Sequence, residues 1–513
     1  MVVQSARAVC WQSYSLLFGR ALMVGAMCVG LGCTGGSFVE KPRPDAGLEP
    51  TPFVPVEPLS WTTPDGVSVV YLPDQELPII SVSVAFPGGS YRARNPLAAR
   101  IMGALLRRGG AGNASREEID KDLRERSARI EASTDGESVS IAANCLKGDE
   151  GRVAEIMNEM IGRPRFAEEE FALVKKQLRE QIVRRKDDPD SIAGLVFGQL
   201  LYGTDSPYVD TTTVGDVERL TRADVAKEHR RLVGSNGAIV AISGDLTRDE
   251  AASVVDRITR GVVRTNGSHA MTSESSPGFP PIKGKVRPGA YFVEGPFSQA
   301  TVIVGQLGVA RLSPDWFDIL VFNEIFGSGS MSSRLFAEVR TRRGLAYVSG
   351  GAISPGVVQG KNYLYVQTKS ASVGEAIDAS VGVLEGMQQS PVADDAVSDR
   401  KRALTNSFVF ANQSPADIVS RRAAFQLQGY PADYDTTFVA NLAKVNPARI
   451  EAVAKNRWNT DDFVVVVVGD ATARESLRGS RFVQSKWAGK ATKTRSLITE
   501  LRFDGVGSGV GIR

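Results

Sequence analysis

Two stretches of the chain show the same succession of hydrophobic patterns. Short runs rich in Val, Ile and Ala, such as residues 79–86, alternate with longer runs in which apolar residues recur with helical spacing. One example is the helix expected after Ser313, whose apolar face holds Trp316, Ile319 and Phe326. Strands mixed with several helices predict an α+β fold, in which helices pack on one face of a mostly antiparallel sheet.

Landmarks of this pattern recur in the same order in both stretches. Asn95-Pro96 and Ser313-Pro314 each place proline directly after an N-cap residue, and the two pairs lie 218 positions apart. The next landmarks also correspond, namely Gly109 with Gly327 as helix ends and Asp188-Pro189 with Ser414-Pro415 as helix starts. Both stretches finish on an apolar strand that runs into Gly-Asp. The shared order and nearly constant offset indicate two homologous domains that arose by duplication.

Changes in composition set the expected domain boundaries. Residues 34–57 are rich in proline, which predicts an extended tether, and residues 261–290 are rich in Gly, Ser and Pro, which predicts a linker. We therefore expect a first domain at 58–260, a second domain at 291–480 and a C-terminal tail at 481–513. Two such domains on a flexible linker would form one half of a clamshell.

The first 33 residues differ from the rest and resemble a signal peptide. Two arginines precede an apolar run at 21–32, which is too short to span a bilayer. The run ends at Gly-Cys, which resembles a bacterial lipoprotein processing site and makes Cys33 the expected lipidation site. Ordinary signal cleavage is the alternative. Because Thr34 rather than aspartate follows the cysteine, we expect an exported lipoprotein of the cell envelope, at the outer membrane and facing the periplasm.

Charge and cysteine content narrow the classes of partner. The chain has 513 residues with 61 basic and 58 acidic side chains, and it shows no basic stripe interleaved with aromatic residues. Nucleic acid is therefore not an expected partner. If Cys33 is acylated, Cys145 is the one thiol left in the mature chain, and its apolar neighbours predict a buried, inert thiol.

Three spaced motifs in the second domain carry a family resemblance. They are a glycine-rich turn at 326–331, Ser-Arg-Leu-Phe at 333–336 and Arg-Gly-Leu-Ala-Tyr at 343–347. In this order they resemble the second domain of the pitrilysin/insulinase/processing-peptidase family of zinc peptidases, and the likeness extends over roughly residues 58–480.

The resemblance assigns substrate binding to Arg343 and Tyr347. In the family, an arginine and a tyrosine of the second domain reach the substrate near the zinc. A guanidinium and a phenol can both donate hydrogen bonds to a carbonyl oxygen that becomes anionic during hydrolysis. Because Arg340 and Arg342 are neighbours, the sequence leaves open which arginine faces the cavity. The alternative is a surface ion pair at Arg343 and a packing role for Tyr347.

The first domain lacks the metal ligands that the family uses. The inverted zinc motif H-x-x-E-H is replaced by Arg100 and Ala104 at the histidine positions and by Gly103 at the glutamate position. Arginine is a permanent cation, and alanine and glycine have no ligand atom. Glu180 falls where the third ligand would lie, and without the others we expect it to be a surface residue. The chain holds only two histidines, both expected in structural roles: His229 and His269.

The resemblance therefore implies a non-catalytic, substrate-gripping subunit of a two-subunit zinc peptidase. We expect no cofactor and no metal in this chain, with zinc held by a partner relative that carries H-x-x-E-H. The complex would be a heteromeric metalloendopeptidase acting on peptides or unfolded segments in the cell envelope. Two alternatives stay open, a structural or assembly protein without a role in hydrolysis and a stand-alone peptide-binding lipoprotein.

Overall fold

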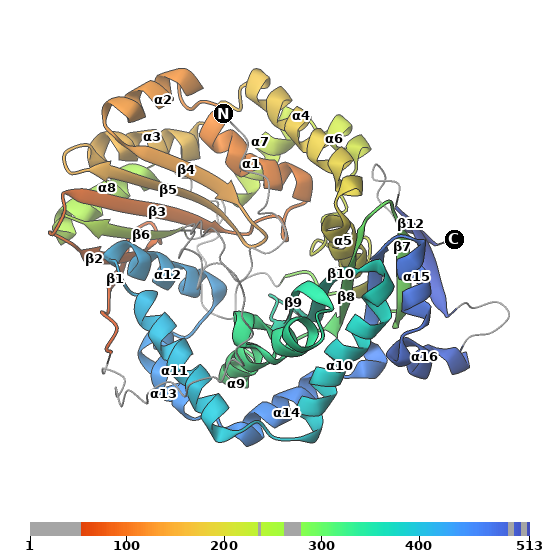
Figure 1. Cartoon of the computed structure of the whole chain (residues 1–513). Helices are drawn as coiled ribbons and strands as arrows, with labels where there is room; N and C mark the ends of the chain where they lie inside the picture. Colours follow the sequence, from red (N-terminus) through yellow and green to blue (C-terminus); the bar gives the residue numbers. More distant parts are fainter. Residues whose placement is uncertain (1–52, 234–237, 261–278, 491–496, 504–509, 513) are drawn as a thin grey trace, which may run out of the picture.

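A computed structural model describes residues 53–233, 238–260, 279–490, 497–503 and 510–512. It contains two mixed sheets, one formed largely by each sequence copy (Figure 1). Among the helices of these residues, none is both long enough and apolar enough to cross a membrane.

The first sheet has the strand order β1-β2-β6-β3-β5-β4. Neighbouring strands are antiparallel except β2 and β6, which run parallel. Along β3, buried positions alternate with more exposed ones, as expected of a strand whose one face meets the core. The strands are β1 (Leu59–Thr62), β2 (Ser68–Pro73), β3 (Ile79–Pro87), β4 (Arg129–Thr134), β5 (Ser138–Leu146) and β6 (Ile239–Gly244).

The helices of the first copy pack mainly over one face of this sheet (Figure 1). Met102 and Met157 of two of these helices share a core with Val82 and Val84 of β3. The helices are α1 (Pro96–Arg108), α2 (Arg116–Glu125), α3 (Glu150–Gly162), α4 (Glu168–Arg184), α5 (Pro189–Tyr202), α6 (Val214–Arg219), α7 (Arg222–Leu232) and α8 (Arg248–Thr259), with a 3₁₀ turn, η1 (Arg185–Asp187).

The second sheet has the order β13-β12-β7-β11-β8-β10-β9. The pairs β12–β7 and β7–β11 are parallel, and the others are antiparallel. Strands β12 and β13 come from the segment expected to be a tail, so the C-terminal region extends this sheet. The strands are β7 (Gly289–Glu294), β8 (Gln299–Leu307), β9 (Ala346–Ser354), β10 (Lys361–Lys369), β11 (Val464–Gly469), β12 (Ile498–Phe503) and β13 (Val510–Ile512).

The second copy repeats the helical layer with local differences. Its α-helices are α9 (Trp316–Asn323), α10 (Val373–Gln389), α11 (Asp394–Phe410), α12 (Pro415–Gln428), α13 (Tyr434–Ala443), α14 (Pro447–Arg457), α15 (Ala471–Arg478) and α16 (Arg481–Trp487). Two π-helical segments, η2 (Glu324–Ser328) and η4 (Phe336–Arg342), flank a 3₁₀ turn, η3 (Ser330–Ser332). Further 3₁₀ turns are η5 (Ser370–Ser372), η6 (Thr460–Asp462) and η7 (Ala488–Lys490).

The two copies exchange one helix each. Helix α5 of the first copy covers the outer face of the second sheet, where Val196 packs in one core with Val466 of β11. Helix α12 of the second copy covers the outer face of the first sheet, where Val419 packs with Ile239 of β6 (Figure 1). The predicted α+β architecture with helices on one face is confirmed, and each opposite face takes a single helix from the other copy.

The helix starts expected from sequence are partly confirmed. The Asn95 side chain accepts a hydrogen bond from the Ala98 N–H at 3.0 Å, and Asp188 and Ser414 cap α5 and α12 in the same way. The expected start at Ser313 is wrong. Helix α9 begins at Trp316, because the Ser313 hydroxyl donates to Asp315 instead of capping the helix. The helix end expected at Gly327 is also wrong, since η2 carries the helical path to Ser328.

Candidate functional site

Helix α1 presents the residues that replace the zinc motif. Arg100 and Ala104 lie one helical turn apart on the more exposed face, while Gly103 is buried against β4. A guanidinium, a methyl group and a hydrogen atom provide no metal ligand, so these residues do not fit a zinc ion. Across the residues that the structure describes, no group of three or more His, Cys, Asp or Glu is placed to hold a metal.

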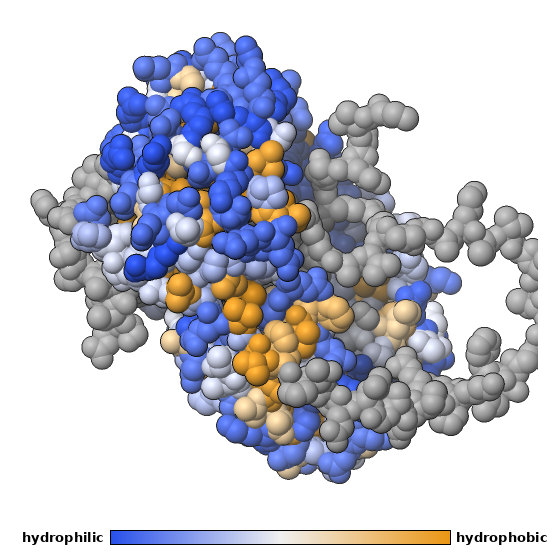
Figure 2. All heavy atoms as spheres, turned by 90° about the vertical axis from the view of Figure 1, so that its left-hand side faces the viewer, coloured by the Kyte–Doolittle hydropathy of each residue, from blue (hydrophilic) through white to orange (hydrophobic). Residues whose placement is uncertain are grey.

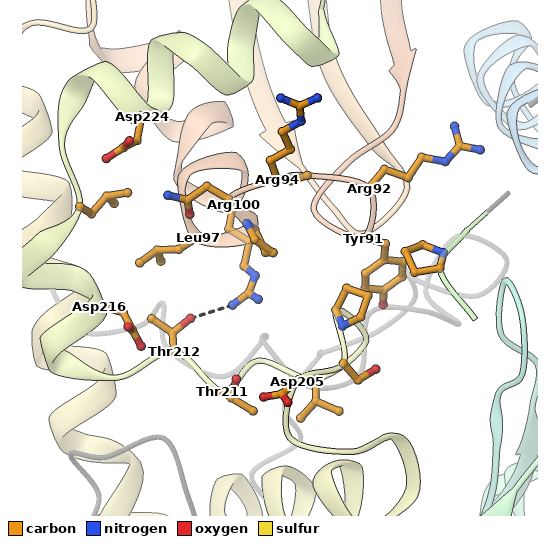
Figure 3. A pocket seen from close by; sticks show the side chains of 18 of the residues that line it. Tyr91, Arg92, Arg94, Leu97, Arg100, Asp205, Thr211, Thr212, Asp216 and Asp224 are labelled. Carbon is orange, nitrogen blue, oxygen red and sulfur yellow. Dashed lines mark hydrogen bonds between the residues drawn. The ribbon is translucent and has the colours of Figure 1, made fainter. Parts of the chain in front are cut away.

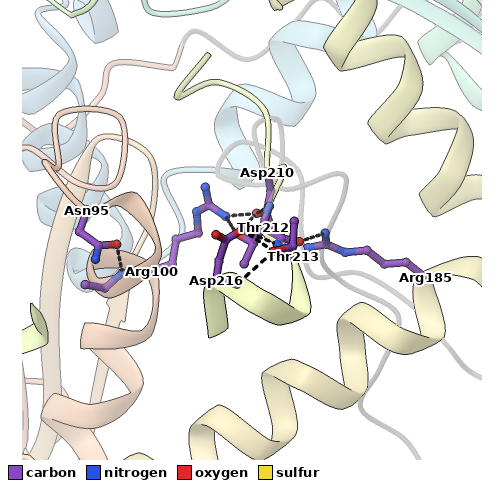
Figure 4. Close-up of polar contacts among 8 residues, drawn as sticks. Asn95, Arg100, Arg185, Asp210, Thr212, Thr213 and Asp216 are labelled. Atoms are coloured by element: carbon purple, nitrogen blue, oxygen red, sulfur yellow. Dashed lines mark hydrogen bonds and ion pairs between the residues drawn. The ribbon is translucent and has the colours of Figure 1, made fainter. Parts of the chain in front are cut away.

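Arg100 is fixed by contacts with the loop between α5 and α6 (Figure 4). Its Nη1 donates to the carboxylate of Asp210 and, at 3.0 Å, to Oγ1 of Thr212. The other oxygen of Asp210 accepts from Nη2 of Arg185 at 2.7 Å. Burial raises the pKa of Asp210, but the positive charges of Arg100 and Arg185 outweigh it, so the pKa lies below its usual value. One ionised carboxylate is thus shared by two guanidinium groups.

Arg100 also lines a cavity of about 690 Å³ (Figure 3). The cavity lies between the first turn of α1 with its preceding loop, the loop at 204–212 and Pro280. In the close-up, the Arg100 side chain points into the hollow toward Thr212, whereas Arg92 and Arg94 point away from its centre. This volume is within the range of roughly 300–1,000 Å³ that is typical of ligand pockets.

Tyr347 lies near the start of β9 in the second copy. Gly344 has a φ of +62°, a left-handed conformation that ends η4 and leads into the strand. The Tyr347 side chain is 72% exposed, which is unusual for a large aromatic residue. It is therefore accessible to a partner or a substrate rather than filling a packed sheet position.

The arginine beside Tyr347 is Arg340. Its guanidinium carbon lies 5.2 Å from the centre of the Tyr347 ring and 4.8 Å from that of Phe336, so the cation is placed between two aromatic rings. The guanidinium of Arg343 instead donates to Glu338 at 2.8 Å and lies 3.7 Å from Glu375. The hydrogen bond from Arg343 holds the pKa of Glu338 below its usual value. Arg343 thus forms the surface ion pairs that the sequence left as the alternative.

The other residues singled out in the sequence have ordinary surroundings. Burial lowers the pKa of His229 to about 4, and its ring packs edge-on against Phe166 with the centroids 5.6 Å apart. Burial raises the pKa of the Cys145 thiol to about 12, which agrees with an inert thiol. Glu180 is exposed on α4. Cys33 and His269 lie outside the described residues.

The sequence did not identify three residues that define these sites. Asp210 holds Arg100 from a loop 110 positions later, and no local pattern connects the two. Tyr91 lines the cavity but precedes α1 as a single aromatic residue in a polar loop. Arg340 was visible as a neighbour of the motif, but spacing alone could not distinguish it from Arg342 and Arg343.

Known proteins resemble this chain in sequence and in fold. The family model described as "Peptidase M16 inactive domain" matches residues 219–404. A protein of Streptomyces coelicolor named as an uncharacterized zinc protease is 24% identical over 322 residues, which cover 61% of this chain and 68% of that protein. The non-peptidase homolog YmxG of Helicobacter pylori is 19% identical over 408 residues, with 79% of this chain and 92% of that protein covered.

A solved structure shows the same fold over most of the chain. The crystal structure of a peptidase M16 inactive domain from Pseudomonas fluorescens aligns with a TM-score of 0.70 and 22% identity. The alignment covers 81% of this chain and 99% of that one. The family match, the named relatives and the motifs at 326–347 agree with one another and with the missing ligands on α1. These findings support assignment of the chain to the M16 family of peptidases, the pitrilysin/insulinase/processing-peptidase group, as a protein of the inactive type.

Proposed function

We propose that this chain is the non-catalytic, substrate-gripping subunit of a two-subunit zinc peptidase. The observation that carries the proposal is the exposed Tyr347 beside Arg340, on a chain whose α1 offers no zinc ligands. The partner is a zinc-bearing relative with the H-x-x-E-H motif, and zinc is held there and not in this chain. Its substrates are peptides or unfolded segments.

The chemistry of gripping follows from the donors on and near β9. The Tyr347 hydroxyl can donate to a substrate carbonyl, and the adjacent Arg340 guanidinium adds positive charge where that oxygen becomes anionic. Strand β9 is the last strand in the order of its sheet, so the part of its outer edge near Tyr347 has no strand partner among the described residues. Farther along β9, the Asn323 side chain already bonds both backbone groups of Ile353. An extended peptide can pair with such an edge. Arg343, the arginine expected from the motif, is held by Glu338 and is assigned the supporting role.

The surface offers apolar area for a partner. Figure 2 shows a largely hydrophilic first copy and hydrophobic atoms gathered across the middle of the same face. Exposed apolar side chains of the described residues include Val54 at 80%, Val56 at 55% and Phe410 at 67%. Exposed apolar area of this kind supports association with a second subunit.

We also propose that the complex works in the cell envelope. The signal-like segment, Cys33 and the proline-rich residues 34–57 support a lipid-anchored protein on an extended tether. Replacing Cys33 by Ala should move the exported protein from the membrane fraction to the soluble fraction. Unchanged membrane association would count against the anchor.

The functional test uses the complex of this chain with its zinc-bearing relative. Tyr347→Phe and Arg340→Ala should each lower kcat by about tenfold to a hundredfold with little change in KM, because a donor to a developing oxyanion acts mainly on the transition state. Arg343→Ala is the matched control, since it removes the same charge three residues away and should change kcat much less.

Two results would reject the gripping role. One is wild-type kinetics in an intact complex that carries both Tyr347→Phe and Arg340→Ala. This result would favour the alternative of a structural or assembly protein with a peptidase-like fold. The other is peptidase activity of this chain alone that survives chelators.

A further inference from the structure

We propose that the cavity beside α1 binds a carboxylate group of a peptide, with Arg100 as the anchoring cation. The site is lined by residues of the first copy and by Pro280 of the linker, and it uses none of the residues assigned to gripping on β9. The proposal rests on the proposed function in one respect, namely that the carboxylate belongs to a peptide. The observation that carries the proposal is a guanidinium that lines a cavity and is fixed there by hydrogen bonds from only one of its nitrogen atoms.

Arg100 retains free hydrogen-bonding capacity toward the cavity. Both polar contacts of its guanidinium with the described residues use Nη1, which donates to Asp210 and Thr212. Within the described part of the chain, Nε and Nη2 have no hydrogen-bond partner. A guanidinium presents its donors in a planar fork that matches the two oxygens of a carboxylate. The contacts at Nη1 hold this fork in place, so little side-chain entropy is lost when a ligand binds.

The charges around Arg100 leave the cluster cationic. Asp210 is shared with Arg185, so two guanidinium groups are balanced by one carboxylate. Two acidic groups that line the cavity are held at helix starts, since Asp216 and Asp224 accept from the hydroxyls of the preceding threonines. Asp205 is the remaining lining carboxylate, and it lies on the far side of the cavity from α1 (Figure 3).

Other residues that line the cavity form an apolar surface beside Arg100. Tyr91, Pro207 and Pro280 line the cavity. The ring of Tyr91 packs at 4.9 Å, edge to face, against Tyr208, whose hydroxyl donates to the Pro280 carbonyl at 2.5 Å. A side chain next to the carboxylate can rest on this surface. Aromatic and proline surfaces beside a cation suit the end of a peptide better than a free inorganic anion.

The experiment measures binding to the isolated full-length mature chain by fluorescence anisotropy. Three labelled decapeptides share an alternating Ala-Ser sequence that ends in Leu. The first has a free C-terminal carboxylate, the second a C-terminal amide, and the third an amide with Glu at the preceding position. We expect the first or the third to bind about tenfold or more tightly than the second, because hydrogen bonds to charged groups are the strong ones. The first and third peptides distinguish a chain terminus from an acidic side chain.

Three variants locate the site. Arg100→Met should abolish the advantage of the carboxylate peptides. Arg185→Met is the matched control, because it also removes one ion pair with Asp210 but does not line the cavity, and it should keep most of that advantage. Asp205→Asn should bind the carboxylate peptides at least as tightly as the wild-type chain. Circular dichroism of each variant excludes unfolding as the cause.

The proposal is overturned if the amide peptide binds as tightly as the other two, or if no peptide binds. It is also overturned if Arg185→Met and Arg100→Met lose binding equally, or if Asp205→Asn weakens it. These measurements need neither the partner nor hydrolysis. Failure here therefore leaves the kinetic test at Tyr347 unaffected, and failure at Tyr347 leaves the cavity unaffected.

Discussion

His229 is a titratable side chain with almost no contact with water. It lies on α7, is 7% exposed, and its Nε2 has no hydrogen-bond partner among the described residues. Burial lowers its pKa from 6.5 to about 4, so the folded protein holds a neutral imidazole. In the unfolded chain the same group takes up a proton below about pH 6.5. Protonation therefore favours the unfolded state.

We predict that His229 lowers the free energy of unfolding as the pH falls from about 6.5 toward 4. Its contribution is fully present above about pH 6.5 and is lost as the pH falls toward 4, by at most about 1.4 kcal/mol per pH unit. Urea unfolding of the wild-type chain and of His229→Leu at pH 7, 6 and 5 checks this. The free energy of unfolding of His229→Leu should change less with pH than that of the wild-type chain. If both change equally with pH, His229 is not the group responsible.

At the scale of single elements, α1 packs unusually close to β4. A Cβ atom at Gly103 would lie 2.4 Å from the backbone carbonyl carbon of Ser133, a separation that real structures do not tolerate. The contact is between backbone atoms, so no side chain can rotate away to relieve it. Glycine at this position therefore allows the backbone of α1 to pack directly against the backbone of β4.

We predict that Gly103→Ala destabilises the protein by about 1–3 kcal/mol or more, because the extra methyl group pushes α1 off β4. Gly382→Ala in α10 is the matched control. No atom lies within 4 Å of a Cβ built there, and alanine should stabilise that helix by up to about 1 kcal/mol. Denaturant midpoints measure both. Equal effects of the two substitutions would show that packing at Gly103 is loose.

The same contact has a consequence for the lost zinc motif. The triple change Arg100→His, Gly103→Glu and Ala104→His rebuilds H-x-x-E-H in sequence. The new glutamate would clash with the backbone of β4 and displace the part of α1 that carries both histidines. We therefore expect no stoichiometric zinc in a folded triple variant, measured by elemental analysis.

Elements that depend on local sequence were predictable, and contacts between distant segments were not. Strands β6 and β11 and the caps at Asn95, Asp188 and Ser414 follow from apolar runs and from N-cap residues followed by proline. The true start of α9 depends on an ion pair between Asp315 and Arg457, which are 142 positions apart. The position of Arg340 over the Tyr347 ring, and of Arg343 against Glu338, depends on side-chain geometry that spacing cannot provide.

At the scale of the whole molecule, the exchanged helices bind the two copies into one unit. Without α12, Val70, Ile239 and Ala241 would lie on an open face, although each is at most 2% exposed in the whole chain. Polar contacts support the exchange, since Asp190 of α5 accepts from Thr301 at 2.7 Å and Tyr365 at 2.9 Å. Two domains joined by a flexible linker were expected from sequence. In the structure each copy is completed by the other.

We predict that neither copy folds alone. Residues 53–260 and 279–503 expressed separately should be insoluble or partly unfolded, because each would expose the apolar face that the missing helix covers. Expressed together, the two fragments should form a soluble complex, and the intact chain should unfold in a single transition. Calorimetry and gel filtration provide the measurements. Two well-folded, monomeric fragments would contradict this account.

The exchange also sets an order of events during synthesis. The first sheet is complete in sequence at Gly244, but the helix that covers its outer face ends only at Gln428. A ribosome adds about 5–20 residues per second, so the residues between these two points take roughly 10–40 seconds to synthesise. An exported chain must in addition cross the membrane before α12 can cover this face. Ser68 and Gln426, which finally meet at 2.8 Å, are 358 positions apart. Until α12 is in place, the incomplete chain exposes an apolar face of the sheet. We therefore expect chaperones to bind this face early and to release it late.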